Sequence, residues 1–597
     1  MNNPMSWVRA RCLNLLILVI PLWSGKVLLA QEKLSLEQRD SLLSLFSLEA
    51  DLEGMASFGE DWFEGLTEER EATPLNPRPN GYAMLTLNQA FNNEAKHPPA
   101  GTGIPFGWRQ RTRIAYRRYW EFRFVGDHDP GESLRQGPDH LSSGLIIRPG
   151  SRLRTLAVGD HHVTSGMGLV LATSPQLSLM SGGPAQVLKR GAGVKLHPGS
   201  DETRFLRGLA AEFAWRSLTL RASLSARTID ARIDSTGFDG GAEPVIQKLQ
   251  ITGLHVSDSE ISSRDAAFEE LGAVELLHEK QGIVSGLTLV YVGYSHPVHP
   301  SGLALPSWAP LGRSFTRAGA HVTRRGGAGL LACEAGWSPG LGCALTAGFR
   351  SYDFSGWNLA ARMVAVSPAY PLPHTWIQQG SRFTEGSTLV EINLSWLAGG
   401  GWEIGAAFRY QRISWLAEAA FSEEMKGMLL ASYRMPGPWT LRGVLRFGFD
   451  NQDFRQLWQG MSGRLYLESD PLSLFRVKYG MVLTPGGWLA DFQIRWSLPL
   501  QSFQAGAGLK LFRVAPGTGV IYAYEPDLRY AFSVPALSGE GSRFYLMMRF
   551  TMAKHWQLEA KVWRTGYEDA IHRLQTADPT KDFLQRLGCR LQVTFGF

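Results

Sequence analysis

The chain of 597 residues has little charge and few cysteines. Charged residues make up 19% of it and aromatic residues 11%, which argues against a disordered or acidic scaffold protein. Four cysteines in a chain of this length exclude a small domain held together by disulfides. No stretch rich in Pro, Ser and Gly resembles a linker between ordinary domains. The sequence therefore favours one large ordered unit.

Signatures of catalysis are also scarce. No phosphate-binding Gly-x-x-x-x-Gly-Lys-Ser/Thr loop occurs, and Ser165 lacks the flanking glycines of a nucleophile elbow. Asp160 and His161 are the one pair that could polarise a water molecule, which keeps a hydrolase as a minor alternative. His296 and His299 have a metal-like spacing but no cysteine or carboxylate pair near them in sequence. We expect no enzyme activity, no cofactor and no metal.

The N-terminus has the features of an export signal. Arg9 and Arg11 precede an apolar run over residues 13–23, and the small residue Ala30 follows. This order is typical of a secretory signal peptide, which we assign to residues 1–30. An N-terminal membrane helix is the alternative, but the run is shorter than the roughly 20 residues that span a bilayer. Later in the chain no uncharged apolar run approaches that length.

In most of the remaining chain, apolar residues alternate with polar or small residues. Side chains along a strand point to opposite faces in turn, and the last segment has one apolar face and one polar or small face. Its apolar face consists of Leu587, Cys589, Leu591, Val593, Phe595 and Phe597. A terminal strand that ends on an aromatic residue resembles the signal by which outer-membrane barrels are recognised for insertion. Phe595 and Phe597 are the predicted recognition residues, and the barrel-assembly machinery is the predicted partner.

The same alternation recurs upstream in segments of roughly 9–13 residues, which is the length of a tilted membrane-spanning strand. Aromatic residues gather near many segment ends, as in an aromatic girdle. Because exposed sheet edges are not tolerated in hydrocarbon, such strands must close on themselves. We predict an all-β fold, a large antiparallel outer-membrane barrel of about 20–26 strands over residues 80–597. A secreted soluble all-β protein is the alternative.

Basic residues alternate with the apolar ones. The predicted lumen-facing set is Arg442, Arg446, Arg476, Lys478, Arg495 and Arg590. Such residues could attract anionic cargo by focusing the field of the lumen. They could equally be paired with carboxylates across the lumen, or face lipopolysaccharide phosphates. Lipid and lipopolysaccharide of the outer membrane are the expected surroundings.

Residues 31–79 differ from the barrel in charge. Between residues 31 and 72 twelve acids face three bases, a net charge of −9, whereas the whole chain carries +6. Leucines at positions 42, 45, 48 and 52 have helical spacing. We expect an acidic, partly helical periplasmic segment. It is either a plug attracted to a basic lumen or a solvated tether.

Two further features leave alternatives open. Cys333 and Cys343 lie on neighbouring predicted strands, where they form either a cross-strand disulfide or two unpaired thiols. The proline-rich stretches over residues 295–310 and 367–380 are either long outer loops or segments folded into the barrel. A barrel of this size needs such segments or water, because its own wall side chains do not fill it.

Five stretches resemble a family of large outer-membrane barrels from Bacteroidota-type, Gram-negative bacteria. They are residues 156–171 (LAVGDHHVTSGMGLVL), 189–208 (KRGAGVKLHPGSDETRFLRG), 252–264 (TGLHVSDSEISSR), 348–357 (GFRSYDFSGW) and 380–386 (GSRFTEG). Members are labelled helix-hairpin-helix proteins because a DNA-binding type of helical hairpin precedes the barrel. Residues 31–79 lack the glycine turn of that hairpin, and their acidity would repel nucleic acid. The resemblance thus implies the barrel and not the DNA contact.

Together these features predict a non-enzymatic barrel in the bacterial outer membrane. It would act as a porin-like channel, a transporter or a component of an envelope assembly with protein partners. The alternative is handling of DNA or another polyanion at the outer membrane, although no nucleic-acid motif supports it.

Overall fold

The computed structural model describes residues 80–92, 106–128, 138, 140–150, 152–173, 193–197, 199, 201–234, 243–249, 258–298, 312–351, 355–375, 387–414, 421–450, 461–469, 475–497, 503–515, 520–529, 531, 533–553, 555–567 and 585–596. The predicted signal peptide and acidic segment lie outside these ranges. Within them, no helix is long and apolar enough to cross a membrane.

The described strands form a closed antiparallel barrel with a wall of 24 strands. The first half of the wall contains β1 (Asn80–Asn92), β2 (Phe106–Tyr116), β3 (Trp120–His128), β4 (His140–Ile147), β5 (Leu153–Thr164), β7 (Leu206–Trp215), β8 (Leu218–Ile229), β11 (Ala267–Lys280), β12 (Ile283–Val298), β13 (Gly312–Gly326), β14 (Gly329–Ser338) and β15 (Gly342–Ser351). The second half contains β16 (Trp357–Val366), β17 (Ser387–Ala398), β18 (Trp402–Ser414), β19 (Phe421–Arg434), β20 (Trp439–Asp450), β21 (Ser462–Ser469), β22 (Phe475–Thr484), β23 (Gly487–Ser497), β24 (Phe503–Val514), β27 (Glu540–Ala553), β28 (Trp556–Tyr567) and β29 (Gln585–Gly596). This confirms the predicted fold and range of strand numbers.

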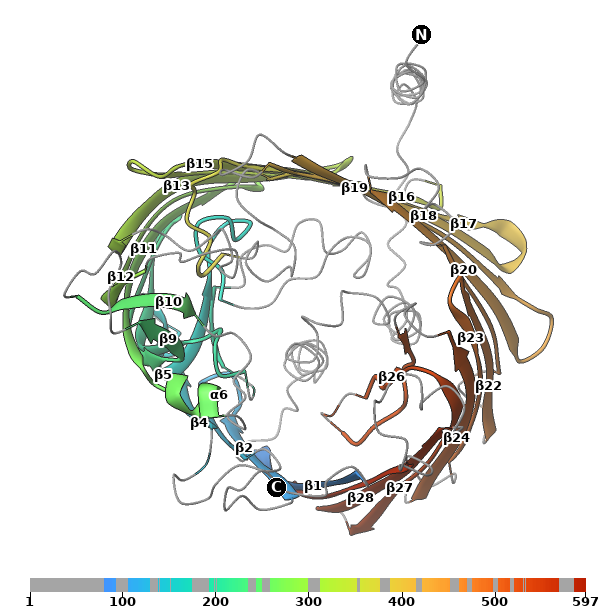
Figure 1. Ribbon diagram of the computed structural model, residues 1–597. Helices are drawn as coiled ribbons and strands as arrows, with labels where there is room; N and C mark the ends of the chain where they lie inside the picture. The colour runs from blue at the N-terminus through green and yellow to red at the C-terminus, as the bar shows by residue number, and fades with distance from the viewer. Residues whose placement is uncertain are drawn as a thin grey trace. The chain divides into compact units, whose positions relative to one another are not determined.

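The wall closes because its first and last strands are neighbours. β1 pairs with β29 in antiparallel register, from Tyr82 opposite Gly596 to Asn92 opposite Arg586. Every other wall strand pairs with its neighbours along the wall. Figure 1 looks along the barrel and shows this ring of strands. No strand edge of the wall is therefore left for lipid to contact.

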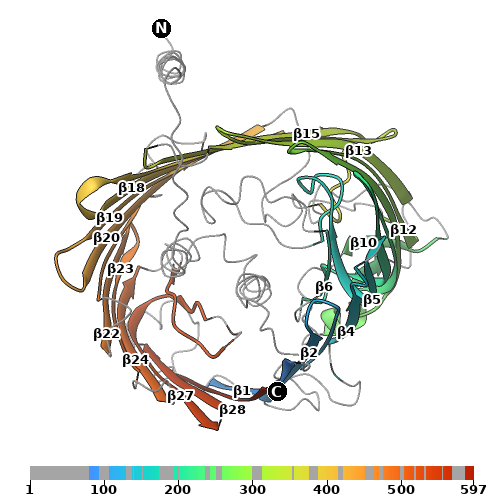
Figure 2. The same cartoon turned by 180° about the vertical axis from the view of Figure 1, so that it is seen from behind.

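Further elements lie inside the ring. They are β6 (Gly193–Leu196), β9 (Ala231–Asp234), β10 (Val245–Leu249), the short helix α6 (Asp258–Ser263), and the pair β25 (Ile521–Tyr522) and β26 (Ala536–Leu537). A 3-10 turn, η7 (Gly399–Gly401), joins β17 to β18. β6 pairs with β5, and β10 pairs with β9 and, in parallel, with β12. Figure 2 shows β6 and β10 on the inner side of the wall.

The two faces of the wall differ in character. Large apolar side chains are exposed on the outside, among them Leu224, Leu287 and Leu331 with 65%, 62% and 55% of their surface accessible. In water such a surface would be unfavourable by about 25 cal/mol per Å² of apolar area, but in lipid it costs nothing. Charged residues lie mainly on the inner face and are buried there. This distribution rules out the soluble alternative.

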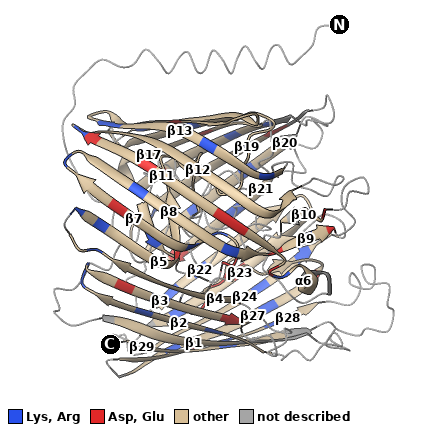
Figure 3. Ribbon diagram, turned by 90° about the vertical axis from the view of Figure 1, so that its left-hand side faces the viewer, with Lys and Arg blue, Asp and Glu red and all other residues tan. Residues whose placement is uncertain are grey.

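The connections separate the barrel into two ends. On one side, short turns over residues 117–119, 148–152, 216–217, 281–282 and 327–328 join consecutive strands. On the other side, most connections are long, as over residues 93–105, 129–139, 299–311 and 367–386, with β14–β15 and β22–β23 as short exceptions. We name these the turn end and the loop end; in Figure 3 they lie at left and right. Short turns mark the periplasmic side of an outer-membrane barrel.

Candidate functional site: the barrel lumen

Two groups of described segments fold into the lumen, and each contacts a different arc of the wall. The first inner body consists of residues 165–173, residues 193–197 with β6, and residues 370–375. The second inner body consists of residues 520–537, with β25 and β26. The rest of the inner wall carries polar and charged side chains. Together these parts form the candidate site.

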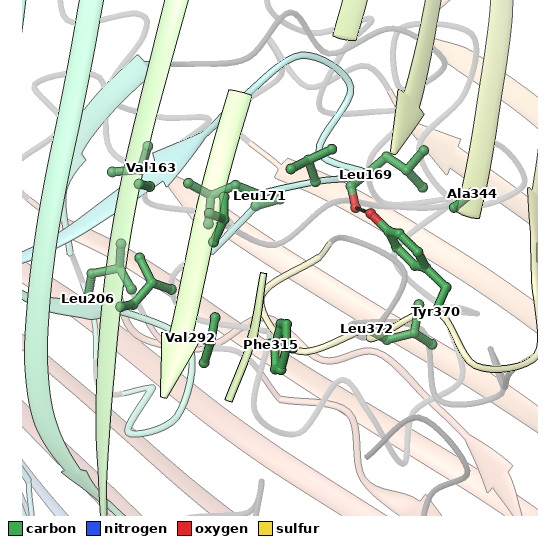
Figure 4. Packing of buried hydrophobic residues seen from close by; sticks show 14 of the residues in the cluster. Val163, Leu169, Leu171, Leu206, Val292, Phe315, Ala344, Tyr370 and Leu372 are labelled. Carbon is green, nitrogen blue, oxygen red and sulfur yellow. Dashed lines mark hydrogen bonds between the residues drawn. The ribbon is translucent and has the colours of Figure 1, made fainter. Parts of the chain in front are cut away.

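Apolar packing holds the first inner body. Leu169, Val170 and Leu171 are buried in one large cluster with wall residues such as Val292 and Phe315. Tyr370 belongs to the same cluster and its hydroxyl donates to the carbonyl of Leu169 at 3.4 Å (Figure 4). This confirms the inward alternative for residues 370–375 of the second proline-rich stretch.

Buried wall carboxylates hold the backbone of this body. Glu334 on β14 accepts hydrogen bonds from the amides of Met167, Leu169 and Val170 at 2.5, 3.2 and 3.0 Å. The hydroxyl of Ser165 donates to Glu275 on β11 at 2.7 Å. Because an unpaired buried carboxylate would be costly, these contacts tie residues 165–173 to specific wall positions.

Residues 370–375 are fixed by charged wall residues as well. His374 Nε2 lies 2.9 Å from Glu269, which also accepts from Arg227 at 3.0 Å. Arg317 donates to the carbonyl of Pro371 at 2.9 Å. The burial of Tyr370 raises the pKa of its phenol to about 12. The tyrosine thus stays a hydrogen-bond donor across the physiological pH range.

A histidine cluster joins residues 193–197 to the wall. His197 Nδ1 lies 3.0 Å from His162 Nε2, and the His197 ring stacks on Phe205 with 4.9 Å between centroids. Burial, and then the neighbouring His162 and His140, hold the pKa of His197 well below its ordinary value. His197 is therefore neutral at physiological pH. Among the residues that the structure describes, no group of His, Cys, Asp and Glu could hold a metal ion.

The second inner body is attached mainly by ion pairs. Glu525 is fully buried and accepts from Arg543 at 2.6 and 3.0 Å, while Lys561 lies 3.4 Å from it. Asp527 lies 2.5 Å from Arg590 and 3.6 Å from Lys561. These three basic residues belong to β27, β28 and β29, so the body spans neighbouring strands.

Electrostatics favour the ionised form of the Glu525 carboxylate. Burial acts to raise its pKa, but the hydrogen bonds and charge of Arg543, with Lys561 and Lys510, outweigh burial and lower it. Lys510 also donates to the carbonyl of Tyr524 at 3.1 Å. A smaller apolar cluster supports this attachment with Ile521, Ala523 and Leu537 against wall residues.

The structure places all six predicted basic residues on the inner face. Arg442 and Arg446 on β20 are buried, in the register that faces away from the exposed Leu445. Arg476 pairs with Glu468 at 2.5 Å, and Lys478 lies over the Tyr466 ring at 4.6 Å. That these residues line a path for solutes stays a prediction.

Two of these residues have partners that the sequence did not indicate. Arg590 pairs with Asp527 of the second inner body, and Arg495 donates to Gln504 at 2.8 Å. Thus Arg590 anchors a segment of the chain itself and is not free for cargo. Of the predicted recognition residues, Phe595 packs on Trp556 with 4.7 Å between centroids. Phe597 lies outside the described residues.

The hydrolase alternative does not fit the geometry. The Asp160 carboxylate accepts from Arg207 at 2.7 and 2.9 Å. His161 instead contacts the carbonyl of Gly159 and the Ser223 hydroxyl, each at 2.9 Å, and is fully buried. Asp160 is therefore committed to an ion pair and does not orient His161.

The structure also distinguishes a disulfide between Cys333 and Cys343 from two unpaired thiols. Cys333 and Cys343 are both free thiols. Cys343 lies opposite Trp337, whereas Cys333 lies opposite Ala347, so the register keeps the two residues apart. A cross-strand disulfide is excluded, and the unpaired thiols are confirmed. His296 lies on β12, and His299 lies outside the described residues.

No family model matches the chain, and no curated protein matches it. Similar solved structures include a P pilus tip assembly intermediate from E. coli (9% identity, 87% of this chain and 62% of that chain, TM-score 0.41). Another is the P pilus usher translocation pore (9% identity, 87% of this chain and 99% of that chain, TM-score 0.36). A third is the FrpB iron transporter from Neisseria meningitidis (9% identity, 87% of this chain and 82% of that chain, TM-score 0.39). The chain thus spans less than two thirds of the first of these. Function must be argued from this chain's own residues.

Strand closure, the apolar outer face and the polar inner face together decide the setting of the molecule. A wall of this kind is stable only where lipid surrounds it, and closed barrels with short turns at one end are the outer-membrane form. The protein is a 24-strand β-barrel of the bacterial outer membrane.

Proposed function

We propose that the protein is a non-enzymatic outer-membrane channel for anionic solutes, with the second inner body narrowing its passage. The observation that carries this proposal is the basic inner arc of β20–β23. Arg442, Arg446, Arg464, Arg476, Lys478 and Arg495 share the inner face of these four strands. A low-dielectric wall lined by one sign of charge concentrates ions of the other sign.

Charge balance on the arc supports anion preference. Of the carboxylates on its inner face, Glu468 pairs with Arg476, and Asp491 lies 2.8 Å from Lys510 on the next strand. On the described inner face of β20–β23, six basic side chains thus stand beside two carboxylates, Glu468 and Asp491. Among the described residues, neither apolar cluster of the two inner bodies includes a residue of β18–β21, whereas the cluster of the second inner body includes Val482 of β22 and Leu489 of β23. The β18–β21 part of the wall is the best candidate for the solute path.

The alternative role in DNA or polyanion handling would use the same arc, so one set of variants tests both. An assembly role would depend instead on partners bound outside the lumen. The mature protein in planar bilayers under a salt gradient gives the ratio of anion to cation permeability. We expect anion preference, and we expect Arg442→Glu/Arg446→Glu to reverse it.

Arg324→Glu/Arg325→Glu, at the turn end of β13, reverses the same number of charges outside the arc and should leave the preference unchanged. Arg495→Glu serves as a second, single change if the first variant does not fold, with folding checked by heat-modifiable gel mobility. Equal effects of the arc and control variants, or no conductance at all, would contradict the channel. If the protein retains DNA strongly at low salt, releases it at high salt and shows no conductance, polyanion handling is favoured instead.

A further inference from the structure

Arginines gather at the turn end on one sector of the barrel. Five of them line a single pocket of about 520 Å³: Arg118, Arg148, Arg152, Arg154 and Arg216. They come from the β2–β3, β4–β5 and β7–β8 turns and from the first residues of β5. Figure 3 shows basic residues in blue at the left-hand, turn end of the barrel. We name these five residues the arginine rim.

Backbone hydrogen bonds join the three turns into one surface. The Arg148 amide donates to the carbonyl of Tyr119 at 2.6 Å, and the Ala214 amide donates to the carbonyl of Arg152 at 2.7 Å. The first bond links the β2–β3 turn to the β4–β5 turn, and the second links that turn to β7. Because the turns are fixed to one another, the backbone positions that carry these arginines are held close before any ligand binds.

The rim differs from the lumen in charge pairing. Lumen arginines such as Arg207, Arg221 and Arg227 each pair with a buried carboxylate. No rim arginine forms an ion pair with a carboxylate in the part of the chain that the structure describes. Guanidinium groups keep their charge at any physiological pH, so a cluster of them attracts a multiply charged anion.

We propose that the arginine rim is the docking surface for the acidic segment of this same chain, residues 31–72. Charge complementarity is the first reason, since that segment carries a net charge of −9 and has six of its acids between positions 60 and 71. The second reason is position. The segment precedes β1 in the chain, and β1 pairs with β2. The turn that follows β2 carries Arg118, the first residue of the arginine rim.

The chain is long enough for this contact. Position 72 is eight residue steps from Asn80, the first residue of β1. An extended chain covers at most about 3.3–3.6 Å per residue, so this stretch reaches nearly 30 Å. From β1 to the β7–β8 turn the wall advances by five or six strands at about 4.8 Å each, a comparable distance. The acids nearest β1 therefore reach the whole rim. In the lumen, Arg543 and Arg590 are already paired with carboxylates of the second inner body.

A carbodiimide crosslink in the full mature protein tests the contact directly. The reagent joins a carboxylate to a lysine amine but not to a guanidinium, so Arg152→Lys/Arg154→Lys keeps the charge and adds the reactive group. We expect crosslinks from positions 152 and 154 to acids among residues 60–71, identified by mass spectrometry. We expect 1 M NaCl to suppress them, because salt screens exposed charges over about 3 Å at that concentration.

The matched control is Arg324→Lys/Arg325→Lys, which also places two lysines on a turn-end hairpin but outside the pocket; it should give few such crosslinks. In a second experiment, trypsin should cleave within residues 31–72 severalfold faster in Arg152→Glu/Arg154→Glu than in the parent protein. Glu68→Arg/Glu69→Arg in the same chain should restore protection. Equal crosslinking at both pairs of positions overturns the proposal. So does its absence, including the case in which the rim instead captures anionic phospholipid or an acidic partner protein.

Discussion

The two inner bodies occupy the same lumen but are held by different forces. The first is bound mainly by a large apolar cluster, and wall carboxylates such as Glu334 accept hydrogen bonds from its backbone. The second has a much smaller apolar cluster and depends on Glu525 and Asp527 against three basic wall residues, Arg543, Lys561 and Arg590. Packing resists change over a wide range of conditions, whereas ion pairs respond to charge, salt and pH.

This difference suggests that one inner body is fixed and the other can move. Removing one partner of a buried ion pair costs about 3–5 kcal/mol, because the other charge stays buried without compensation. A body held in this way is released by a small chemical change. A body held by close packing is a permanent part of the wall. The second inner body is therefore the candidate for the movable part of the passage.

The largest expected effect comes from Glu525→Gln/Asp527→Asn. Arg543, Lys561 and Arg590 then lack their carboxylate partners, so residues 520–537 should leave the wall. We expect a severalfold change in single-channel conductance, measured in planar bilayers. Glu540→Gln removes a half-exposed pair with Arg513 and should change nothing. An unaltered conductance in the double variant would refute the ionic attachment.

A smaller effect on function but a clear effect on stability is expected for Leu171→Ala. Leu171 is almost fully buried in the first inner body, and the truncation should cost about 2–5 kcal/mol. We expect a lower midpoint of thermal unfolding in detergent, with conductance close to that of the parent. Leu224→Ala on the lipid face is the control and should leave the midpoint nearly unchanged. A changed conductance with an unchanged midpoint of unfolding would mean that the first inner body, and not the second, controls the passage.

The smallest effect near neutrality is the response to pH. The Glu525 pKa is lowered in the folded protein, so its ion pair contributes fully above the ordinary value of about 4.3 and is lost as the pH falls through the folded value. Conductance should thus be constant from pH 8 to about 5 and change only below about 4. A transition near pH 6 would contradict control by Glu525 and would point to a histidine whose pKa lies near the ordinary value.

The wall could be predicted from the sequence because each strand reveals its own two faces. Leu587, Leu591 and Phe595 lie outside and Arg590 inside, as their alternation indicates. The inner bodies could not be predicted in this way. Residues 520–524 (VIYAY) resemble a short strand, and only their distant partners show that they belong inside. The partner of Asp527, Arg590, lies 63 residues along the chain, a separation that no local pattern encodes.

The lumen residues illustrate the same limit. Alternation assigns Arg442, Arg446, Arg476, Lys478, Arg495 and Arg590 to the strand face opposite the exposed apolar residues. It does not reveal which of them meet a carboxylate, because that depends on strand register and on inserted segments. Glu334 was missed for a similar reason. A lone acid between apolar and small residues is the only local sign of its role, and its amide partners lie more than 160 residues away.

The seam between β1 and β29 has a consequence for biogenesis. Thr86 donates a hydrogen bond to Gln592 at 3.1 Å across that seam, although the two residues are 506 positions apart. Contacts between such distant positions form late, since the intervening chain must first be ordered. Until β29 arrives, the nascent sheet has two unsatisfied borders that would attract other strands. Pairing of the final strand with β1 thus removes both borders at once, and with them the part of the sheet most prone to aggregate.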